Sequence, residues 1–173
     1  MILRILGIDP GLATVGFGIV DTDKNSMKLL TCGIISTPAN TPLSSRLDRI
    51  YADMCELIKT FSPDVISIEE LFFNTNITTG ISVAQGRGVI LLCAYRMGLS
   101  VMEYTPLQVK QSVVGYGRAD KHQVQEMVRR ILKLSAIPKP DDAADAVALA
   151  LCHARSTTSL LNLEGGQAPC STI

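Results

Sequence analysis

Apolar runs and helical periodicities alternate along this chain in a regular order. Apolar runs bounded by turn residues predict five strands, at residues 2–9, 15–22, 27–36, 65–68 and 101–104. Apolar positions at three- and four-residue steps predict helices at residues 43–61, 77–97, 121–134 and 141–155, and Pro106 can open a further short helix. The first three strands are joined by short connections, whereas later strands alternate with helices. This order predicts a mixed α/β sheet, three antiparallel strands followed by parallel ones, with helices on both faces.

The length of the chain suits one domain. We expect residues 1–155 to form that domain, because every predicted element lies within them. Residues 156–173 are rich in Ser, Thr and Gly and have no periodicity, so we expect a disordered tail. Gly86 and Gly88 interrupt the helix predicted at residues 77–97, and we expect them to mark close packing.

Composition bears on where the protein works. No apolar run approaches the roughly 18 residues that would suggest a membrane span. The five cysteines are scattered and odd in number, and none forms a C-x-x-C pair. This pattern argues against a zinc site or a disulfide framework, and it is typical of a reducing compartment. We therefore expect a cytoplasmic protein with no membrane association.

Charge gives no general support for nucleic-acid binding. The formal net charge is zero and the pI is about 6.7, whereas nucleic-acid-binding domains usually carry a basic footprint. Positive charge is concentrated between residues 107 and 140, where seven basic residues outnumber two acidic ones. Any interaction with DNA would therefore depend on this segment, whose basic residues are Lys110, Arg118, Lys121, Arg129, Arg130, Lys133 and Lys139.

Acidic residues stand at the ends of two predicted strands and at the start of the last helix. Sites in open α/β sheets lie beyond the carboxyl ends of strands, and Asp9 and Glu69 occupy such ends. Each has an ordinary alternative role, Asp9 as a turn residue before Pro-Gly and Glu69 as a solvated strand end. The acidic residues of the last helix could simply favour its dipole, with Asp141 as the N-cap.

Asp142 and Asp145 are harder to explain by helix formation alone. They lie three residues apart and so share a helix face, and Asp145 sits among small apolar residues with no Lys or Arg within one turn. A half-buried carboxylate needs a partner. If the fold brought Asp9, Glu69, Asp142 and Asp145 together, their repulsion would be relieved by a pair of Mg²⁺ ions, which suit phosphodiester cleavage. The acids therefore suggest a nuclease.

Five stretches of the chain, in order and together covering roughly residues 3–155, resemble the RuvC family of Holliday junction resolvases. One stretch alone would be weak evidence, but five in the right order and spacing are specific. The stretches are Gly7-Ile-Asp-Pro-Gly11 with Gly16-Phe-Gly18, Ile68-Glu-Glu-Leu-Phe72, Gln85-Gly-Arg-Gly-Val89 with Gly86 where Ala is common, Gln108-Val-Lys-Gln-Ser-Val-Val-Gly115 with Gly117-Arg-Ala-Asp-Lys-His-Gln-Val124, and Asp142-Ala-Ala-Asp-Ala-Val147 with Ala150-Leu-Cys-His153.

The resemblance implies a ribonuclease H-like fold, a homodimer and paired incision of four-way DNA junctions that leaves 5′-phosphate and 3′-hydroxyl ends. It implies that the catalytic, metal-binding acids are Asp9, Glu69, Asp142 and Asp145, and it leaves Glu70 as a bystander. The implied cofactor is Mg²⁺, with two ions per subunit and Mn²⁺ able to substitute. A branch-migrating helicase is the implied protein partner.

The resemblance also implies DNA contacts. Lys110 and Lys121 match family lysines near DNA at the active site, Arg118 lies in the same matched stretch, and Phe72 matches an aromatic residue that contacts bases near the crossover. Each has an ordinary alternative, a solvated surface charge for the basic residues and a core position for the phenylalanine.

Two other functions remain open at this point. A non-catalytic junction-binding protein could share the fold, and only the intact set of acids argues against it. An actin-like phosphotransferase also begins with a strand and a Gly-x-Asp-x-Gly turn, but such proteins need a second domain and a second glycine-rich phosphate loop, and no such loop stands in this sequence.

Overall fold

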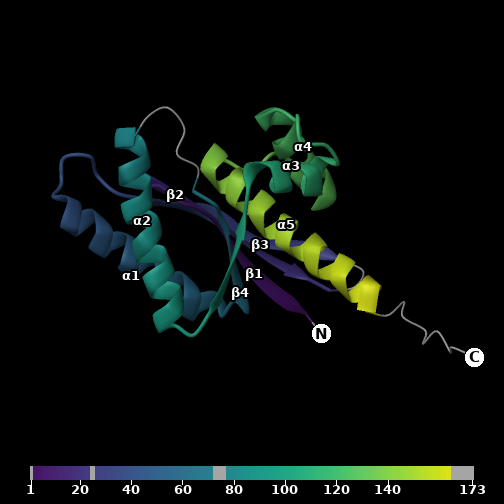
Figure 1. The fold of residues 1–173 in the computed structure, drawn as a ribbon, viewed down its shortest axis with the longest axis horizontal. Helices are drawn as coiled ribbons and strands as arrows, with labels where there is room; N and C mark the ends of the chain where they lie inside the picture. Colours follow the sequence, from purple (N-terminus) through teal and green to yellow (C-terminus); the bar gives the residue numbers. More distant parts are fainter. Residues whose placement is uncertain (1, 24–25, 72–76, 165–173) are drawn as a thin grey trace, which may run out of the picture.

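The predicted mixed sheet is present in the computed structural model, which describes residues 2–23, 26–71 and 77–164 (Figure 1). Its strands run in the order β3-β2-β1-β4-β5. β1 pairs antiparallel with β2 and β2 with β3, whereas β4 is parallel to both β1 and β5. The bounds are Leu3–Asp9 for β1, Thr14–Thr22 for β2, Met27–Ser36 for β3, Val65–Glu69 for β4 and Ser100–Tyr104 for β5.

Helices cover both faces of this sheet, as the sequence predicts (Figure 1). α1 and α2 pack together on one face, and α5 crosses the other face over β1 and β2, with α3 and α4 beside it. The bounds are Leu43–Phe61 for α1, Ile77–Arg96 for α2, Pro106–Val114 for α3, Lys121–Ile131 for α4 and Asp141–Glu164 for α5. Within the described ranges, no helix combines the length and apolarity needed to cross a membrane.

Alternation along the strands divides the core into two layers. Leu6 and Ile8 of β1 join the cluster that packs under α1 and α2, whereas Ile5 belongs to the cluster under α5. Successive residues of a strand point to opposite faces, so Gly7 and Asp9 share the α5 face with Ile5. β4 follows the same rule, with Ile66 and Ile68 on the α1–α2 face. Glu69 therefore also lies on the α5 face.

Three glycines form the surface on which α5 lies. Gly7 is directly opposite Gly18 in the antiparallel pair, and Gly16 is opposite Asp9, so all three glycines share the α5 face. The contacts that a Cβ atom would make there are 2.0 Å to the Ala146 carbonyl oxygen at Gly7, 2.0 Å to the Asp142 carbonyl oxygen at Gly16 and 2.5 Å to Val147 Cγ2 at Gly18. Any side chain at these positions would push α5 away from the sheet.

The two glycines of α2 differ from each other. A Cβ at Gly86 would lie 2.5 Å from the Gly11 carbonyl oxygen, which confirms the close packing predicted there. Gly88 faces open space, so the same prediction was wrong for it.

The last helix is longer than the sequence pattern indicates. We expected it to end at residue 155, but α5 continues to Glu164, so residues 156–164 are helical instead of belonging to a disordered tail. The hydroxyl of Ser156 donates to the Cys152 carbonyl at 2.9 Å, and that of Thr157 donates to the His153 carbonyl at 3.1 Å. These bonds let residues that usually favour loops remain inside a helix. Residues 165–173 lie outside the described part of the chain.

We predict that Gly7→Ala lowers the free energy of unfolding by about 1–3 kcal/mol or more, because its Cβ would overlap the backbone of α5. Ser45→Ala is the control, since Ser45 is an exposed residue of α1, and Ala there should change the free energy of unfolding by less than about 1 kcal/mol. Urea unfolding of both variants measures the difference. Equal stability of the two variants would contradict the role of Gly7 as a contact surface.

Candidate metal centre

Asp9 and Glu69 lie side by side at one edge of the sheet. Asp9 is the last residue of β1, and Glu69 is the last residue of β4. The two strands are parallel neighbours in which Ile8 pairs with Ile68, so their next residues leave the sheet together. Buried β-branched residues pack these strands into the core, among them Ile5, Ile8, Ile66 and Ile68. Two carboxylates are thus fixed at adjacent strand ends, as expected for a site in an α/β sheet.

The start of α5 adds two more carboxylates to this edge. Asp142 and Asp145 lie three residues apart, and the backbone of Asp142 sits directly over Gly16, which pairs with Asp9. The negative charges of Glu69, Asp145 and Asp142 all raise the pKa of Asp9, so the four acids are close enough to interact. The structure therefore brings together the acids that the sequence singled out.

We use the name acid cluster for Asp9, Glu69, Asp142 and Asp145. Burial and repulsion between acids raise the pKa values of Asp9, Glu69 and Asp145. Burial, followed by the charges of the other three acids, raises the pKa of Asp9 to about 7. Burial and the charge of Asp145 raise the pKa of Glu69, and burial raises that of Asp145. The site thus favours bound protons or another cation over free carboxylates.

Lys121 is the cation that lies nearest to the acids in the described part of the chain. Its Nζ lies 2.9 Å from Asp145 Oδ2 and 3.8 Å from Asp141 Oδ2, and the hydrogen bond to Asp145 raises the pKa of the lysine. Asp145 therefore has the partner that a half-buried carboxylate needs. The sequence could not show it, because Lys121 comes from α4 and not from a neighbouring turn of α5.

The start of α4 is fixed by a reciprocal cap. The Asp120 carboxylate accepts a hydrogen bond from the Gln123 backbone N–H at 2.8 Å, and Gln123 Oε1 accepts one from the Asp120 N–H at 2.9 Å. This capping box begins the helix at Lys121, the residue that contacts the acid cluster. The capping box, which is a local sequence signal, thus determines where α4 begins and so where Lys121 is placed.

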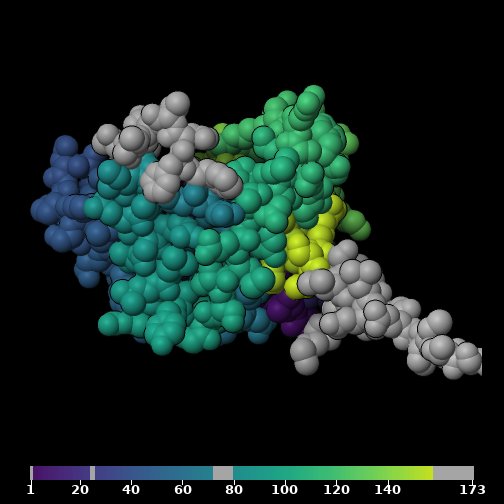
Figure 2. Space-filling model, in the orientation of Figure 1, coloured from purple at the N-terminus to yellow at the C-terminus, as the bar shows by residue number. Residues whose placement is uncertain are grey.

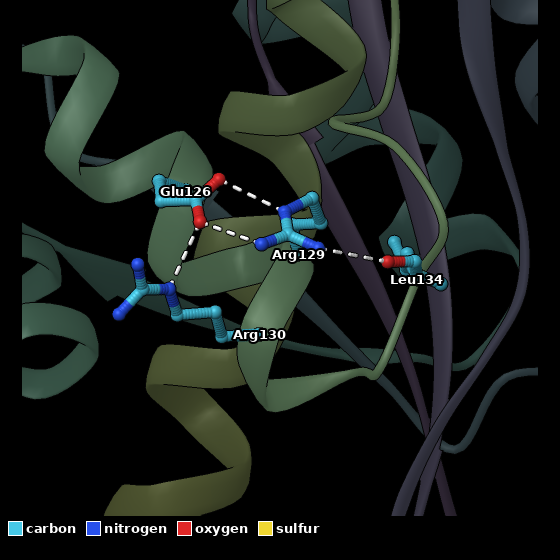
Figure 3. Close-up of polar contacts among 4 residues, drawn as sticks. All are labelled: Glu126, Arg129, Arg130 and Leu134. Carbon is cyan, nitrogen blue, oxygen red and sulfur yellow. Dashed lines mark hydrogen bonds and ion pairs between the residues drawn. The ribbon is translucent and has the colours of Figure 1, made fainter.

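Part of the positive charge between residues 107 and 140 is neutralised within α4 itself. Glu126 accepts hydrogen bonds from both Arg129 and Arg130, and Arg129 also donates to the Leu134 carbonyl (Figure 3). Hydrogen bonds from Arg129 and Arg130 lower the pKa of Glu126 to about 2. Arg129 and Arg130 are therefore engaged in contacts around the end of α4, and they are less available to bind a ligand elsewhere.

Lys110 and Arg118 differ from these arginines. Lys110 of α3 lines a cavity of about 170 Å³ together with Glu69, Lys121 and Asp145, so it faces the acid cluster. Arg118 is exposed in the connection between α3 and α4. Across residues 2–23, 26–71 and 77–164, no ion pair engages either residue. Phe72, the fourth residue assigned to DNA contact, lies outside the described residues.

Arg87 of α2 is a contact that the sequence reasoning missed. Its Nε donates to the Glu69 carbonyl oxygen at 3.4 Å, and its guanidinium pairs with Glu103 of β5. Beside it, the Glu70 N–H donates to the Tyr104 carbonyl at 2.9 Å, and the Glu70 side chain is exposed. These contacts fix the backbone at Glu69. The available signal was a single basic residue between two glycines of an apolar helix.

Asp141 has a different role from the N-cap that we expected. The Pro140 carbonyl accepts hydrogen bonds from the N–H groups of Ala143 and Ala144, so Asp141 already lies in the first turn of α5. Its carboxylate instead accepts a 2.7 Å hydrogen bond from Lys139, which lowers the pKa of Asp141. The capping prediction was wrong because the proline backbone supplies the first helical acceptor.

The acid cluster fits a divalent cation by its chemistry. Carboxylate oxygens are the ligands that Mg²⁺ and Mn²⁺ prefer, and a cation would offset the burial and the repulsion that raise the pKa of Asp9. As arranged in the described residues, no three Asp, Glu, His or Cys side chains converge closely enough to surround one ion. The side chains would thus have to turn inward around a bound ion.

Comparison with known proteins identifies the family. The family model "Crossover junction endodeoxyribonuclease RuvC" matches residues 5–153. The protein of that name from Rubrobacter xylanophilus is 57% identical over 152 residues, which cover 88% of this chain and 85% of the relative. The one from Desulfitobacterium hafniense is 54% identical over 164 residues, covering 95% of this chain and 99% of the relative.

Solved structures agree with the sequence comparison. The structure of T. thermophilus RuvC in complex with a Holliday junction substrate matches with a TM-score of 0.87 and 35% identity, covering 91% of this chain and 96% of the other. Ydc2, the yeast mitochondrial Holliday junction resolvase, has the same fold at a TM-score of 0.72 and 16% identity, covering 94% of this chain and 84% of its own. RuvC proteins are metal-dependent nucleases. This chain belongs to the RuvC family of crossover junction endodeoxyribonucleases.

Proposed function

We propose that this chain is a structure-selective endonuclease that resolves four-way DNA junctions. It makes paired cuts by phosphodiester hydrolysis and leaves 5′-phosphate and 3′-hydroxyl ends, in recombination and DNA repair. The observation that carries this proposal is the acid cluster, four carboxylates on one face of the sheet beside Lys121. The solved relative bound to a Holliday junction supports the choice of substrate. The family match sets aside the actin-like phosphotransferase.

Asp9, Glu69, Asp142 and Asp145 would hold the metal, which we take to be two Mg²⁺ ions per subunit, with Mn²⁺ able to substitute. Such a pair of ions supplies stabilisation of the attacking and leaving oxygens during phosphodiester hydrolysis. Burial and mutual repulsion disfavour the free carboxylates of Asp9, Glu69 and Asp145, so a bound cation is favoured there.

Three cationic residues and one aromatic residue would hold the DNA. Lys110 and Lys121 face the acid cluster, where a lysine can contact a phosphate as a point charge. Arg118 would contact the DNA backbone nearby. Phe72 would stack on an unpaired base at the crossover, an interaction worth roughly 1–3 kcal/mol per base. The formal net charge of zero leads us to expect that binding depends on few phosphates.

A non-catalytic junction-binding protein is the second candidate. The same fold and the same lysines would serve it equally well. It would not require the acid cluster, in which burial disfavours the charged forms of Asp9, Glu69 and Asp145 in the absence of a cation. Cleavage of a four-way junction with and without Mg²⁺ separates the two functions.

A homodimer suits this substrate, because a junction has two-fold symmetry and needs two matched cuts. α2 offers a surface for it: Ile81, Leu92 and Tyr95 are 52%, 48% and 83% exposed and form a stripe along one side of the helix, with Gly88 between them open to solvent. We infer that this stripe is the dimer contact. We also propose that a branch-migrating helicase is a partner of this chain and that the protein is cytoplasmic.

We predict that Asp9→Asn, Glu69→Gln, Asp142→Asn and Asp145→Asn each abolish cleavage while leaving junction affinity within a few-fold. Each change removes a metal ligand, whereas affinity depends mainly on phosphate-facing cations. Cleavage of a labelled junction beside a gel-shift titration measures both. Asp141→Asn is the matched control and should cut normally, because Asp141 is held by Lys139. Robust cleavage by Asp145→Asn would remove that residue from the site.

Asp9 makes the metal-free protein sensitive to pH. Its folded pKa of about 7 exceeds the ordinary 3.8, so the folded state binds more protons and loses stability as pH rises between these values. We predict that metal-free Asp9→Asn is more stable than the unsubstituted protein, by a margin that widens up to about pH 7 at no more than about 1.4 kcal/mol per pH unit. Melting curves at several pH values measure the margin, and Mg²⁺ should reduce it. A margin independent of pH would show that Asp9 is not perturbed.

Lys121→Ala should flatten the dependence of log affinity on log salt by about one unit, if the lysine neutralises one phosphate. It should also slow cleavage at saturating enzyme, because Asp145 loses the partner 2.9 Å away. Lys28→Ala on the edge strand β3 is the control, since Lys28 is exposed and outside the acid cluster. The assignment of Lys121 fails if slope and rate both match those of Lys28→Ala.

Leu92→Glu should convert the dimer to monomers, because it places a charge in the α2 stripe. Ile2→Glu, which alters an apolar residue outside α2 that is more exposed than Leu92, should leave the dimer intact. Sedimentation equilibrium gives both masses. A dimer that survives Leu92→Glu, or an unsubstituted protein that is monomeric while it cuts both strands, would rule out this contact.

A further inference from the structure

Two cysteines from different helices lie in contact on the face of the sheet away from the acid cluster. Cys55 of α1 and Cys93 of α2 are 38 positions apart in sequence, and their Sγ atoms are 3.3 Å apart. Cys55 is partly exposed, whereas Cys93 is buried. A disulfide requires about 2.05 Å, so the sulfurs must approach by only a little more than 1 Å. We propose that Cys55 and Cys93 form an oxidisable dithiol site, which a small disulfide such as glutathione disulfide converts reversibly into an intrachain bond.

The two thiols are suited to different steps. Cys55 is open to an incoming oxidant, so it reacts first. Burial and the neighbouring Cys55 raise the pKa of Cys93 to about 12, and this thiol therefore stays protonated and protected from solvent reagents. The positive charge of Lys59, one turn after Cys55 on α1, opposes this rise. Cys93 thus acts as the resolving thiol.

The exchange balances in two steps. The Cys55 thiolate attacks one sulfur of glutathione disulfide, whose S–S bond breaks and releases one glutathione thiolate. Cys93 then gives its proton to that thiolate, and its sulfur attacks Cys55 to release the second glutathione. Two electrons pass from the protein dithiol to the two glutathione molecules. Excess reduced glutathione reverses both steps.

The disulfide would link α1 covalently to α2 without contacting the acid cluster. Both cysteines pack in the hydrophobic cluster of the α1–α2 face, whereas α5 and its acids lie on the other face. Closing a loop between positions 38 apart restricts the unfolded chain, so oxidation stabilises the fold. Cys32 and Cys152 lie in the cluster on the α5 side, and the sheet separates them from this pair. The inference is therefore independent of the proposed nuclease function.

The test equilibrates the full chain in glutathione buffers of increasing oxidised fraction, then blocks free thiols and maps tryptic peptides. Residues 50–59 and 88–96 each form a peptide with one cysteine. We expect these two peptides to become linked, with a loss of two hydrogen masses and a melting temperature higher by about 5–10 °C. The rise should disappear on full reduction.

Two variants sharpen the result. Cys93→Ala should leave a persistent glutathione adduct on Cys55, because the resolving thiol is gone, and Cys55→Ala should give neither adduct nor link. Cys32→Ala is the matched control and should form the link normally. The proposal is overturned by an unsubstituted protein that stays reduced, that keeps glutathione on Cys55, or that links either cysteine to another position. Peptide mapping of the unsubstituted protein decides the question even if a variant fails to fold.

Discussion

α5 can lie directly against β1 and β2 only because three glycines leave its path free of Cβ atoms. At Gly7 and Gly16 the added atom would sit 2.0 Å from a carbonyl oxygen of the helix. The same contact sets the position of the site, since the backbone of Asp142 rests on Gly16, and Gly16 pairs with Asp9. A shift of α5 by the width of one methyl group would therefore separate the acids of the helix from those of the strands. The packing of α5 and the position of the acid cluster thus both depend on the contact between α5 and the glycines of β1 and β2.

This contact creates an electrostatic conflict that defines the chemistry. Four carboxylates lie near one another in a partly buried place, and burial followed by the charges of the other three acids raises the pKa of Asp9 to about 7. Lys121 offsets only part of the negative charge. A protein that keeps such an arrangement gives up stability in the absence of a cation, which is how functional sites commonly differ from the rest of a fold. The conflict is what favours a metal-dependent reaction over simple DNA binding.

Features that depend on a local pattern could be predicted from the sequence, whereas contacts between elements distant in the sequence could not. Strand and helix order followed from apolar periodicity, and the acids were recognisable from their place at strand ends and at the start of a helix. The pairing of Asp145 with Lys121 and the contact of Arg87 with Glu69 were not predictable, because each joins separate elements. The end of α5 was misjudged for another reason, since Ser156 hydrogen-bonds within the helix although serine usually favours loops.

Anomalous diffraction from crystals soaked in Mn²⁺ tests the central claim most directly, because it locates the metal without relying on activity. The account predicts metal peaks within bonding distance of the acid cluster, with the side chains of Asp9 and Glu69 from the strands and Asp142 and Asp145 from α5 turned toward them. Mn²⁺ bound elsewhere on the protein, with the four acids left in their metal-free arrangement at saturating concentration, would contradict it.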